Sequence, residues 1–152
     1  MNRRDLIRMN DEEIRAFLEE QRILQVATIG KDGWPHLVAM WYALINDQVV
    51  FWTYAKSQKA INLRRDPRLT CLVESGVRYD ELRGVQIKGR AIINDDRETV
   101  QRIGEVIFER YTGPLNDNTR QLVSAQAPKR VVVFVEPVEI VSWDHRKLGG
   151  SY

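Results

Sequence analysis

Cysteine and histidine are scarce in this chain of 152 residues. It holds one cysteine, Cys71, and two histidines, His36 and His145. A single cysteine excludes an intrachain disulfide framework, and its place in an apolar run predicts an inert, buried thiol. Because the two histidines are far apart in sequence and have no cysteine partner, no zinc site of the usual ligand spacing is expected.

Long apolar runs and the common catalytic motifs are also absent. No segment approaches the roughly 20 apolar residues that span a bilayer, and the N-terminus has no apolar signal segment, so we expect a cytoplasmic protein without a membrane partner. There is no Gly-x-Ser-x-Gly elbow, Walker lysine loop or dinucleotide glycine fingerprint. The sequence therefore identifies no metal site and leaves the catalytic residues unknown.

The charge balance is nearly neutral. The formal net charge of +2 does not indicate a nucleic-acid partner. The length predicts one domain over residues 1–152, with 1–9 and 146–152 as flexible or partner-contacting tails.

Apolar, β-branched segments separated by short turns dominate the chain. They predict six strands, at residues 23–29, 36–45, 48–54, 68–74, 82–93 and 130–143. Helical spacing follows the cap at Asn10, and three further helices are expected near 57–65, 95–111 and 119–127. The predicted fold is mainly β (α+β): a six-stranded antiparallel barrel, closed or split, with peripheral helices.

The turn after the third predicted strand combines hydroxyl and cationic residues. Thr53 ends the strand, Lys56 lies in the connector, Ser57 occupies the N-cap position of the next helix, and Lys59 lies in its first turn. Unpaired backbone N–H groups and the helix dipole favour an anion at such a place. The alternative is an ordinary basic surface helix.

Aromatic residues lie on the two strands beside this turn. Met40, Trp41 and Tyr42 form a broad surface on one strand, and Trp52 and Tyr54 flank Thr53 on the other. Such a wall beside an anion site suits a flat heteroaromatic ring that carries a phosphate. Alternatively, these aromatics simply fill the barrel.

Several segments carry a resemblance to a known family. They are Val26-Ala-Thr-Ile-Gly-Lys-Asp-Gly-Trp-Pro-His36, then Met40-Trp-Tyr, Phe51-Trp-Thr, and Ser57-x-Lys59-x-x-Asn62-Leu-Arg-Arg-Asp-Pro67. With them the chain resembles the pyridoxamine 5′-phosphate oxidase-like flavin and deazaflavin oxidoreductases, most of all the branch that uses coenzyme F420. The resemblance covers roughly residues 10 to 145. The short tail after Trp143 departs from the true pyridoxamine phosphate oxidases, so vitamin B6 chemistry is not predicted.

The resemblance implies a split barrel of the FMN-binding type and a homodimer with cofactor sites between the subunits. Carried over by position, it gives a set of cofactor-binding residues. Those for the phosphate are Thr53, Lys56, Ser57 and Lys59, with Asn62 and Arg64; those for the ring are Met40, Trp41 and Tyr42, beside Trp52; and those able to reach the site from either subunit are Gln86, Lys88 and Trp143.

The expected activity is hydride transfer from reduced F420 to a small unsaturated or conjugated acceptor, such as a quinone, an enone or a tetrapyrrole. Tyr42, Tyr54, His36 or a water would supply any proton. An FMN-dependent oxidase or reductase of the same fold is an alternative. A non-catalytic module that binds a cofactor, a tetrapyrrole or single-stranded nucleic acid is another.

Overall fold

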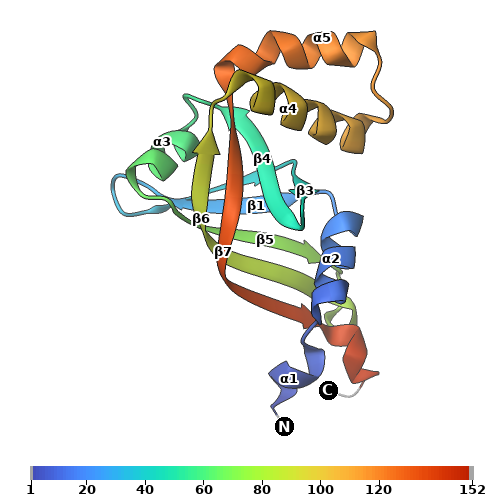
Figure 1. The fold of residues 1–152 in the computed structure, drawn as a ribbon. Helices are drawn as coiled ribbons and strands as arrows, with labels where there is room; N and C mark the ends of the chain where they lie inside the picture. Colours follow the sequence, from blue (N-terminus) through green and yellow to red (C-terminus); the bar gives the residue numbers. More distant parts are fainter. Residues whose placement is uncertain (1, 151–152) are drawn as a thin grey trace.

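The computed structural model describes residues 2–150, which form a strongly curled antiparallel sheet with helices around it (Figure 1). The helices are α1 (Arg3–Ile7), α2 (Asp11–Glu20), α3 (Gln58–Arg65), α4 (Arg97–Thr112) and α5 (Asp117–Gln126). The strands are β1 (Leu24–Ile29), β2 (Pro35–Met40), β3 (Ala43–Ile45), β4 (Gln48–Tyr54), β5 (Arg68–Ser75), β6 (Arg83–Asn94) and β7 (Arg130–Asp144). Short 3₁₀ turns cover Tyr79–Glu81, Ala127–Lys129 and His145–Leu148.

The strand order explains why the sheet is a split barrel. The order is β2-β1-β5-β6-β7-β4-β3, and each recorded pair of neighbours is antiparallel. Strands β2 and β3 follow each other in the chain but lie at opposite edges of the sheet. The sheet therefore curls until its two edges approach, and the barrel stays open between them. The predicted α+β split-barrel class is confirmed.

The predicted number of strands was wrong: the sheet has seven strands, not six. The strand expected over 36–45 is broken at Trp41 and Tyr42. There the hydroxyl of Tyr111, from α4, takes the place of a strand neighbour. It accepts from the backbone N of Tyr42 at 2.9 Å and lies 3.1 Å from the Tyr42 carbonyl oxygen. This contact lets the chain leave β2 at one edge and start β3 at the other.

Irregular points in the strands lie where the sequence indicates them. Asn46 and Asp47 form the two-residue turn between β3 and β4, and both have positive φ angles, as this turn requires. Gly89 of β6 faces Pro137 of β7 across a register shift, so Val138 is an extra, exposed residue. Glycine is needed there because a Cβ on Gly89 would lie 2.6 Å from the Glu136 carbonyl oxygen.

Two hydrophobic clusters lie on the two faces of β4. Val49 and Phe51 point into the barrel, against β1, β5, β6 and α2. Val50 and Trp52 point the other way, against Ile103 and its neighbours on α4. Strand β4 is thus buried on both sides, which fixes the position of the turn at its end.

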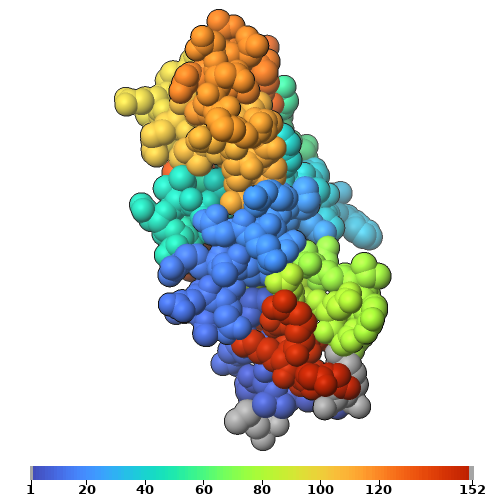
Figure 2. Space-filling model, turned by 90° about the vertical axis from the view of Figure 1, so that its right-hand side faces the viewer, coloured from blue at the N-terminus to red at the C-terminus, as the bar shows by residue number. Residues whose placement is uncertain are grey.

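The two ends of the chain pack together at the end of the molecule away from α4 and α5 (Figure 2). The backbone N of Met9 donates to the Ser142 hydroxyl at 3.0 Å. The ammonium of Lys147 lies 2.8 Å from the Glu13 carboxylate. Met9 and Lys147 belong to the two predicted tails, 1–9 and 146–152, and these contacts attach them to β7 and α2. Residues 1, 151 and 152 of those tails lie outside the described residues. Among residues 2–150, no helix is both long and apolar enough to cross a membrane.

Candidate cofactor site

The turn from β4 to α3 brings together three predicted phosphate-binding residues. Ser57 caps α3 by accepting from the backbone N of Ala60 at 3.2 Å. The Thr53 hydroxyl donates to the Ser57 hydroxyl at 3.3 Å, and the Lys59 ammonium donates to the Thr53 hydroxyl at 3.1 Å. An ammonium and two hydroxyls therefore lie within one hydrogen-bonded cluster at the start of a helix.

The charge of this cluster is not compensated by an acid. The only polar contact recorded for the Lys59 ammonium is the Thr53 hydroxyl, and no carboxylate of residues 2–150 forms an ion pair with it. Burial lowers the pKa of Lys59, and the positive charge of Arg130 lowers it further. Because an unpaired, part-buried cation is costly, this arrangement fits an oxyanion ligand.

Lys56 and Arg64 lie at the exposed side of the same turn. Lys56 is exposed in the connector between β4 and α3. Arg64 donates from Nη1 to the Ala55 carbonyl oxygen at 2.6 Å, and so ties the connector to the helix. Both side chains are on the surface, where further cations attract a negatively charged ligand.

Asn62 has a different environment, because its side chain is fully buried. Its Nδ2 donates to the Thr28 hydroxyl on β1 at 3.1 Å. Its Oδ1 accepts from Gln58 at 2.8 Å and from Arg65 at 3.3 Å. The side chain thus links α3 to the barrel. Its polar atoms are bonded within the described chain, so it stabilises the turn and does not face a ligand.

Met40, Trp41 and Trp52 form a wall near the turn. They line a cavity of about 250 Å³ together with Phe108 and Arg130. Trp41 is 42% exposed and stacks on Tyr111, with ring centroids 4.4 Å apart. Trp52 is buried, and its Nε1 donates to the Val100 carbonyl oxygen at 3.0 Å. Of these side chains, Trp41 offers the most open aromatic surface.

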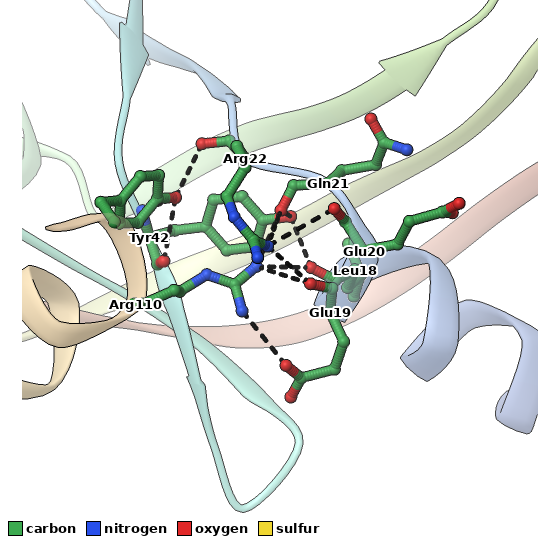
Figure 3. Close-up of polar contacts among 8 residues, drawn as sticks. Leu18, Glu19, Glu20, Gln21, Arg22, Tyr42 and Arg110 are labelled. Carbon is green, nitrogen blue, oxygen red and sulfur yellow. Dashed lines mark hydrogen bonds and ion pairs between the residues drawn. The ribbon is translucent and has the colours of Figure 1, made fainter. Parts of the chain in front are cut away.

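Tyr42 lies in the core, although the sequence pairs it with Trp41. The hydroxyl of this fully buried residue lies 2.6 Å from the Leu18 carbonyl oxygen and 3.0 Å from that of Gln21 (Figure 3). Burial raises the pKa of Tyr42 to about 12. The Arg110 guanidinium covers the ring at 5.0 Å. Tyr42 therefore secures the end of α2, and its ring offers no open face within the described chain.

Trp143 is remote from the turn in the same chain, and Gln86 and Lys88 belong to another strand of the sheet. Trp143 pairs with Gly84 near the end of β7, whereas Arg130 begins that strand beside Tyr54. At about 3.3 Å per residue, the thirteen intervening steps span roughly 40 Å along the strand. Gln86 and Lys88 lie on β6, and Lys88 is 3.9 Å from Glu139.

Two other candidate proton donors remain near the turn. His36 lines a cavity of about 660 Å³ between the β1–β2 hairpin and the first turn of α3. Its Nδ1 is buried and has no hydrogen-bond partner among the described residues. Tyr54 is 50% exposed at the end of β4.

The sequence reasoning missed one residue of this region, Arg130. Its guanidinium lies over the Tyr54 ring, 3.7 Å from the centroid, and beside the cavity wall. In the sequence it is one basic residue at the start of a strand. The signal that could have found it is the pairing of that strand start with Tyr54, next to Thr53.

Comparison with known proteins identifies the family of this chain. The family described as Pyridoxamine 5′-phosphate oxidase matches residues 10–144. This chain belongs to that family. A conserved hypothetical protein of Mycobacterium tuberculosis, Rv2991, has a crystal structure that is similar over 100% of this chain and 95% of its own, with 47% identity and a TM-score of 0.93.

Two of the similar proteins carry names that state an F420-dependent activity or contain F420. The F420H(2)-dependent biliverdin reductase of M. tuberculosis (strain CDC 1551 / Oshkosh) is 26% identical over 121 residues, which cover 78% of this chain and 84% of that protein. A solved structure named F420 reductase is 25% identical, with a TM-score of 0.68, over 83% of this chain and 94% of its own. The relatives thus support an oxidoreductase of the F420-dependent kind at the level of the family.

Proposed function

We propose that this protein is an F420-dependent reductase that passes a hydride to a small conjugated acceptor of the quinone, enone or tetrapyrrole class. The observation that carries the proposal is the cluster of Thr53, Ser57 and Lys59, whose positive charge is unpaired among residues 2–150. F420 contains a phosphate that suits this cluster. The named F420-dependent relatives support the choice of cofactor.

The residues of this chain would bind and orient the cofactor, which supplies the hydride when bound in its reduced form. The hydroxyls of Thr53 and Ser57 and the ammonium of Lys59 hold the phosphate. Trp41 would present its exposed aromatic surface to the deazaflavin ring, and Met40 and Trp52 line the same cavity. The protein's part is therefore positioning and exclusion of water, which needs no protein nucleophile.

The structure favours two of the three side chains considered as proton donors. Tyr42 is poorly suited, because its hydroxyl is occupied by backbone carbonyls and its pKa is raised to about 12 by burial. His36 and Tyr54 flank the turn and have open space beside them. We assign the proton to one of these two, or to a bound water.

A titration of the purified protein with F420 tests the proposal. We expect saturable quenching of tryptophan fluorescence at micromolar F420, because Trp41 and Trp52 lie beside the proposed ring site. Turnover with reduced F420 is then measured across quinones, enones and tetrapyrroles. No binding at these concentrations would refute the cofactor assignment. A yellow protein with an FMN spectrum would favour the FMN-dependent alternative, and binding without turnover of any acceptor would favour a cofactor-binding module.

We further propose that the protein acts as a homodimer through the outer face of its sheet. This face carries exposed apolar side chains, among them Leu37 (64% exposed) and Val138 (68%). Around Val138 it holds a cavity of about 510 Å³, with Lys88 and Arg90 at its border. The exposed acids Glu136 and Glu139 lie on the neighbouring strand, so a second copy can match both charge and apolar surface.

Size measurement in solution tests the dimer. We expect the wild-type chain to have twice the mass of one copy, and Leu37→Glu or Val138→Glu to shift it toward one copy with a loss of F420 affinity. We expect the dimer and the F420 affinity to be lost together, because we assign Gln86, Lys88 and Trp143 to the site of the second copy. A monomeric wild-type protein that binds F420 would contradict this part of the proposal.

A further inference from the structure

Arg130 is held in a fixed position by aromatic side chains. It is the first residue of β7 and pairs with Tyr54 of β4. Its guanidinium lies 3.7 Å from the centroid of the Tyr54 ring and 4.8 Å from that of Trp52. Its Nη2 donates to Oε1 of Gln126, on α5, at 2.9 Å. A planar guanidinium set in this way has little freedom left to lose when it binds a ligand.

The Arg130 guanidinium lies on the face of β4 that α4 covers. Trp52 and Tyr54 alternate along the strand with Thr53, so their side chains point to the opposite face from that of Thr53. Trp52 belongs to the hydrophobic cluster formed with α4. Strand β4 therefore separates Arg130 from the hydrogen-bonded cluster around Thr53, and a ligand of Arg130 needs a site of its own.

A cavity of about 250 Å³ lies beside Arg130 and offers such a site. Most of the residues that line it are apolar, and three of them are aromatic: Trp41, Trp52 and Phe108. Among the described residues that line it, Arg130 is the only charged one. A cavity with aromatic walls, one cation and no acid suits a carboxylate that is attached to an apolar or conjugated body.

Part of the hydrogen-bonding capacity of Arg130 is unused. Its recorded polar partner is the neutral amide of Gln126, and no carboxylate of residues 2–150 forms an ion pair with it. Within the described chain, its Nη1 has no recorded hydrogen bond. A guanidinium matches the geometry of a carboxylate and can donate two parallel hydrogen bonds to it. The position, the surroundings and the free donors of Arg130 thus all fit a carboxylate ligand.

We propose that this cavity binds a carboxylate of the acceptor through the Arg130 guanidinium, so that the protein reduces acidic conjugated acceptors in preference to neutral ones. This inference rests on the proposed function and narrows its substrate class. Trp41 and Trp52, which we place beside the deazaflavin ring, line the same cavity. An acidic arm held by Arg130 would therefore keep the conjugated part of the acceptor close to the ring. Within the proposed classes, this favours tetrapyrroles with acidic side chains, and quinones or enones that carry a carboxylate.

The test compares ligands that differ only in the carboxylate. The binding probes are 2-naphthoate and its methyl ester, which are flat and aromatic. Their binding to the cofactor-free protein is followed by quenching of tryptophan fluorescence, and F420 is titrated separately. For each acceptor that the wild type reduces, kcat/KM is then compared between the free acid and its methyl ester.

The variants are Arg130→Met and Arg130→Lys, with Lys129→Met as the control. Lys129 is exposed and immediately precedes Arg130, but it does not line the cavity. Its replacement therefore removes one positive charge nearby and leaves the proposed site unchanged. Thermal unfolding of each variant shows whether it is folded.

We expect the wild type to bind 2-naphthoate at least ten-fold more tightly than the ester. Arg130→Met should weaken naphthoate binding by about ten- to a hundred-fold, the usual effect of losing a hydrogen bond to a charged group. Binding of the ester and of F420 should change less than three-fold. Arg130→Lys keeps the charge but loses the planar fork, so it should recover part of the affinity. The preference for acidic acceptors in kcat/KM should fall with the affinity for naphthoate.

Equal binding of naphthoate and its ester by the wild type would overturn the inference. An equal loss for both ligands in Arg130→Met would also overturn it, because Arg130 would then be a structural cation that Trp52 and Tyr54 stabilise. If F420 binding fell as much as naphthoate binding, the site would hold a carboxylate of the glutamate tail of F420, and the assignment to the acceptor would be wrong.

If Arg130→Met does not fold, Arg130→Lys with the same ligands decides by itself. Failure of the proposed function gives a different result. Wild-type protein that binds naphthoate through Arg130 but does not bind F420 would refute the cofactor assignment alone.

Discussion

Replacement of Lys59 by Met removes the ammonium from the phosphate site while keeping a side chain of similar length. In the structure this ammonium has one recorded polar contact, the Thr53 hydroxyl at 3.1 Å. A hydrogen bond to a charged group contributes about 1.5–3 kcal/mol. We therefore expect F420 to bind roughly 10- to 150-fold more weakly to Lys59→Met.

The same substitution should have little effect on the stability of the cofactor-free protein. Loss of the bond to Thr53 costs about 1 kcal/mol, and removal of an unpaired cation near Arg130 offsets that loss. We expect the free energy of unfolding to change by less than about 1 kcal/mol, since replacing a charge that solvent can reach usually changes stability by no more than this. This separation of affinity from stability is what distinguishes a ligand-binding lysine from a structural one.

The assay is a fluorescence or calorimetric titration with F420, together with urea unfolding of the cofactor-free protein. Lys129→Met serves as the control for a general loss of positive charge. Unchanged affinity in Lys59→Met would place the phosphate elsewhere. A large drop in unfolding free energy together with the loss of affinity would make Lys59 a structural residue.

Three further predictions concern the framework of the site. Asn62→Ala should lower the free energy of unfolding by about 1–3 kcal/mol in urea denaturation, because it leaves the buried Thr28 hydroxyl without its donor. An unchanged free energy of unfolding would contradict the role of Asn62 as a link between α3 and β1. Gly84→Ala should displace the Trp143 ring, which the added Cβ would approach to 2.2 Å, and a changed near-ultraviolet circular dichroism spectrum is the measurement. The wild type should lose stability as the pH rises from about 10 toward 12, because an unfolded tyrosine ionises near pH 10 while burial holds the pKa of Tyr42 at about 12. Between these pH values the folded state binds more protons than the unfolded state. Tyr42→Phe should therefore lose less stability in the same pH series. If both proteins lost stability with pH at the same rate, Tyr42 would be excluded as the cause.

Much of the fold follows from local patterns in the sequence. Apolar, β-branched segments mark most of the strands. Asn46-Asp47 marks a tight turn, and the structure confirms that it joins β3 to β4. Ser57 was predicted to cap α3 and does so. Each of these features depends on neighbours within a few residues, which is the range over which a single sequence is informative.

The break between β2 and β3 depends instead on a distant residue. Met40, Trp41 and Tyr42 continue the apolar character of the strand, so nothing local marks an interruption. The hydroxyl that replaces the strand partner comes from Tyr111, more than sixty residues away in sequence. The same break turns Tyr42 into the core while Trp41 stays open to solvent.

The candidate site shows the same division between local and distant information. Thr53, Ser57 and Lys59 belong to one turn, and their spacing indicates their contacts. Arg130 reaches Tyr54 and Trp52 only because β7 pairs with β4, a long-range pairing that the sequence does not encode locally. For Asn62, the spacing from Lys59 did not reveal that its side chain faces β1.

A crystal structure of the protein with F420 is the most direct test of the central assignment. The account predicts that the cofactor phosphate lies within hydrogen-bonding distance of the Thr53 and Ser57 hydroxyls and the Lys59 ammonium. A phosphate bound away from the turn between β4 and α3, with these side chains unchanged, would contradict it.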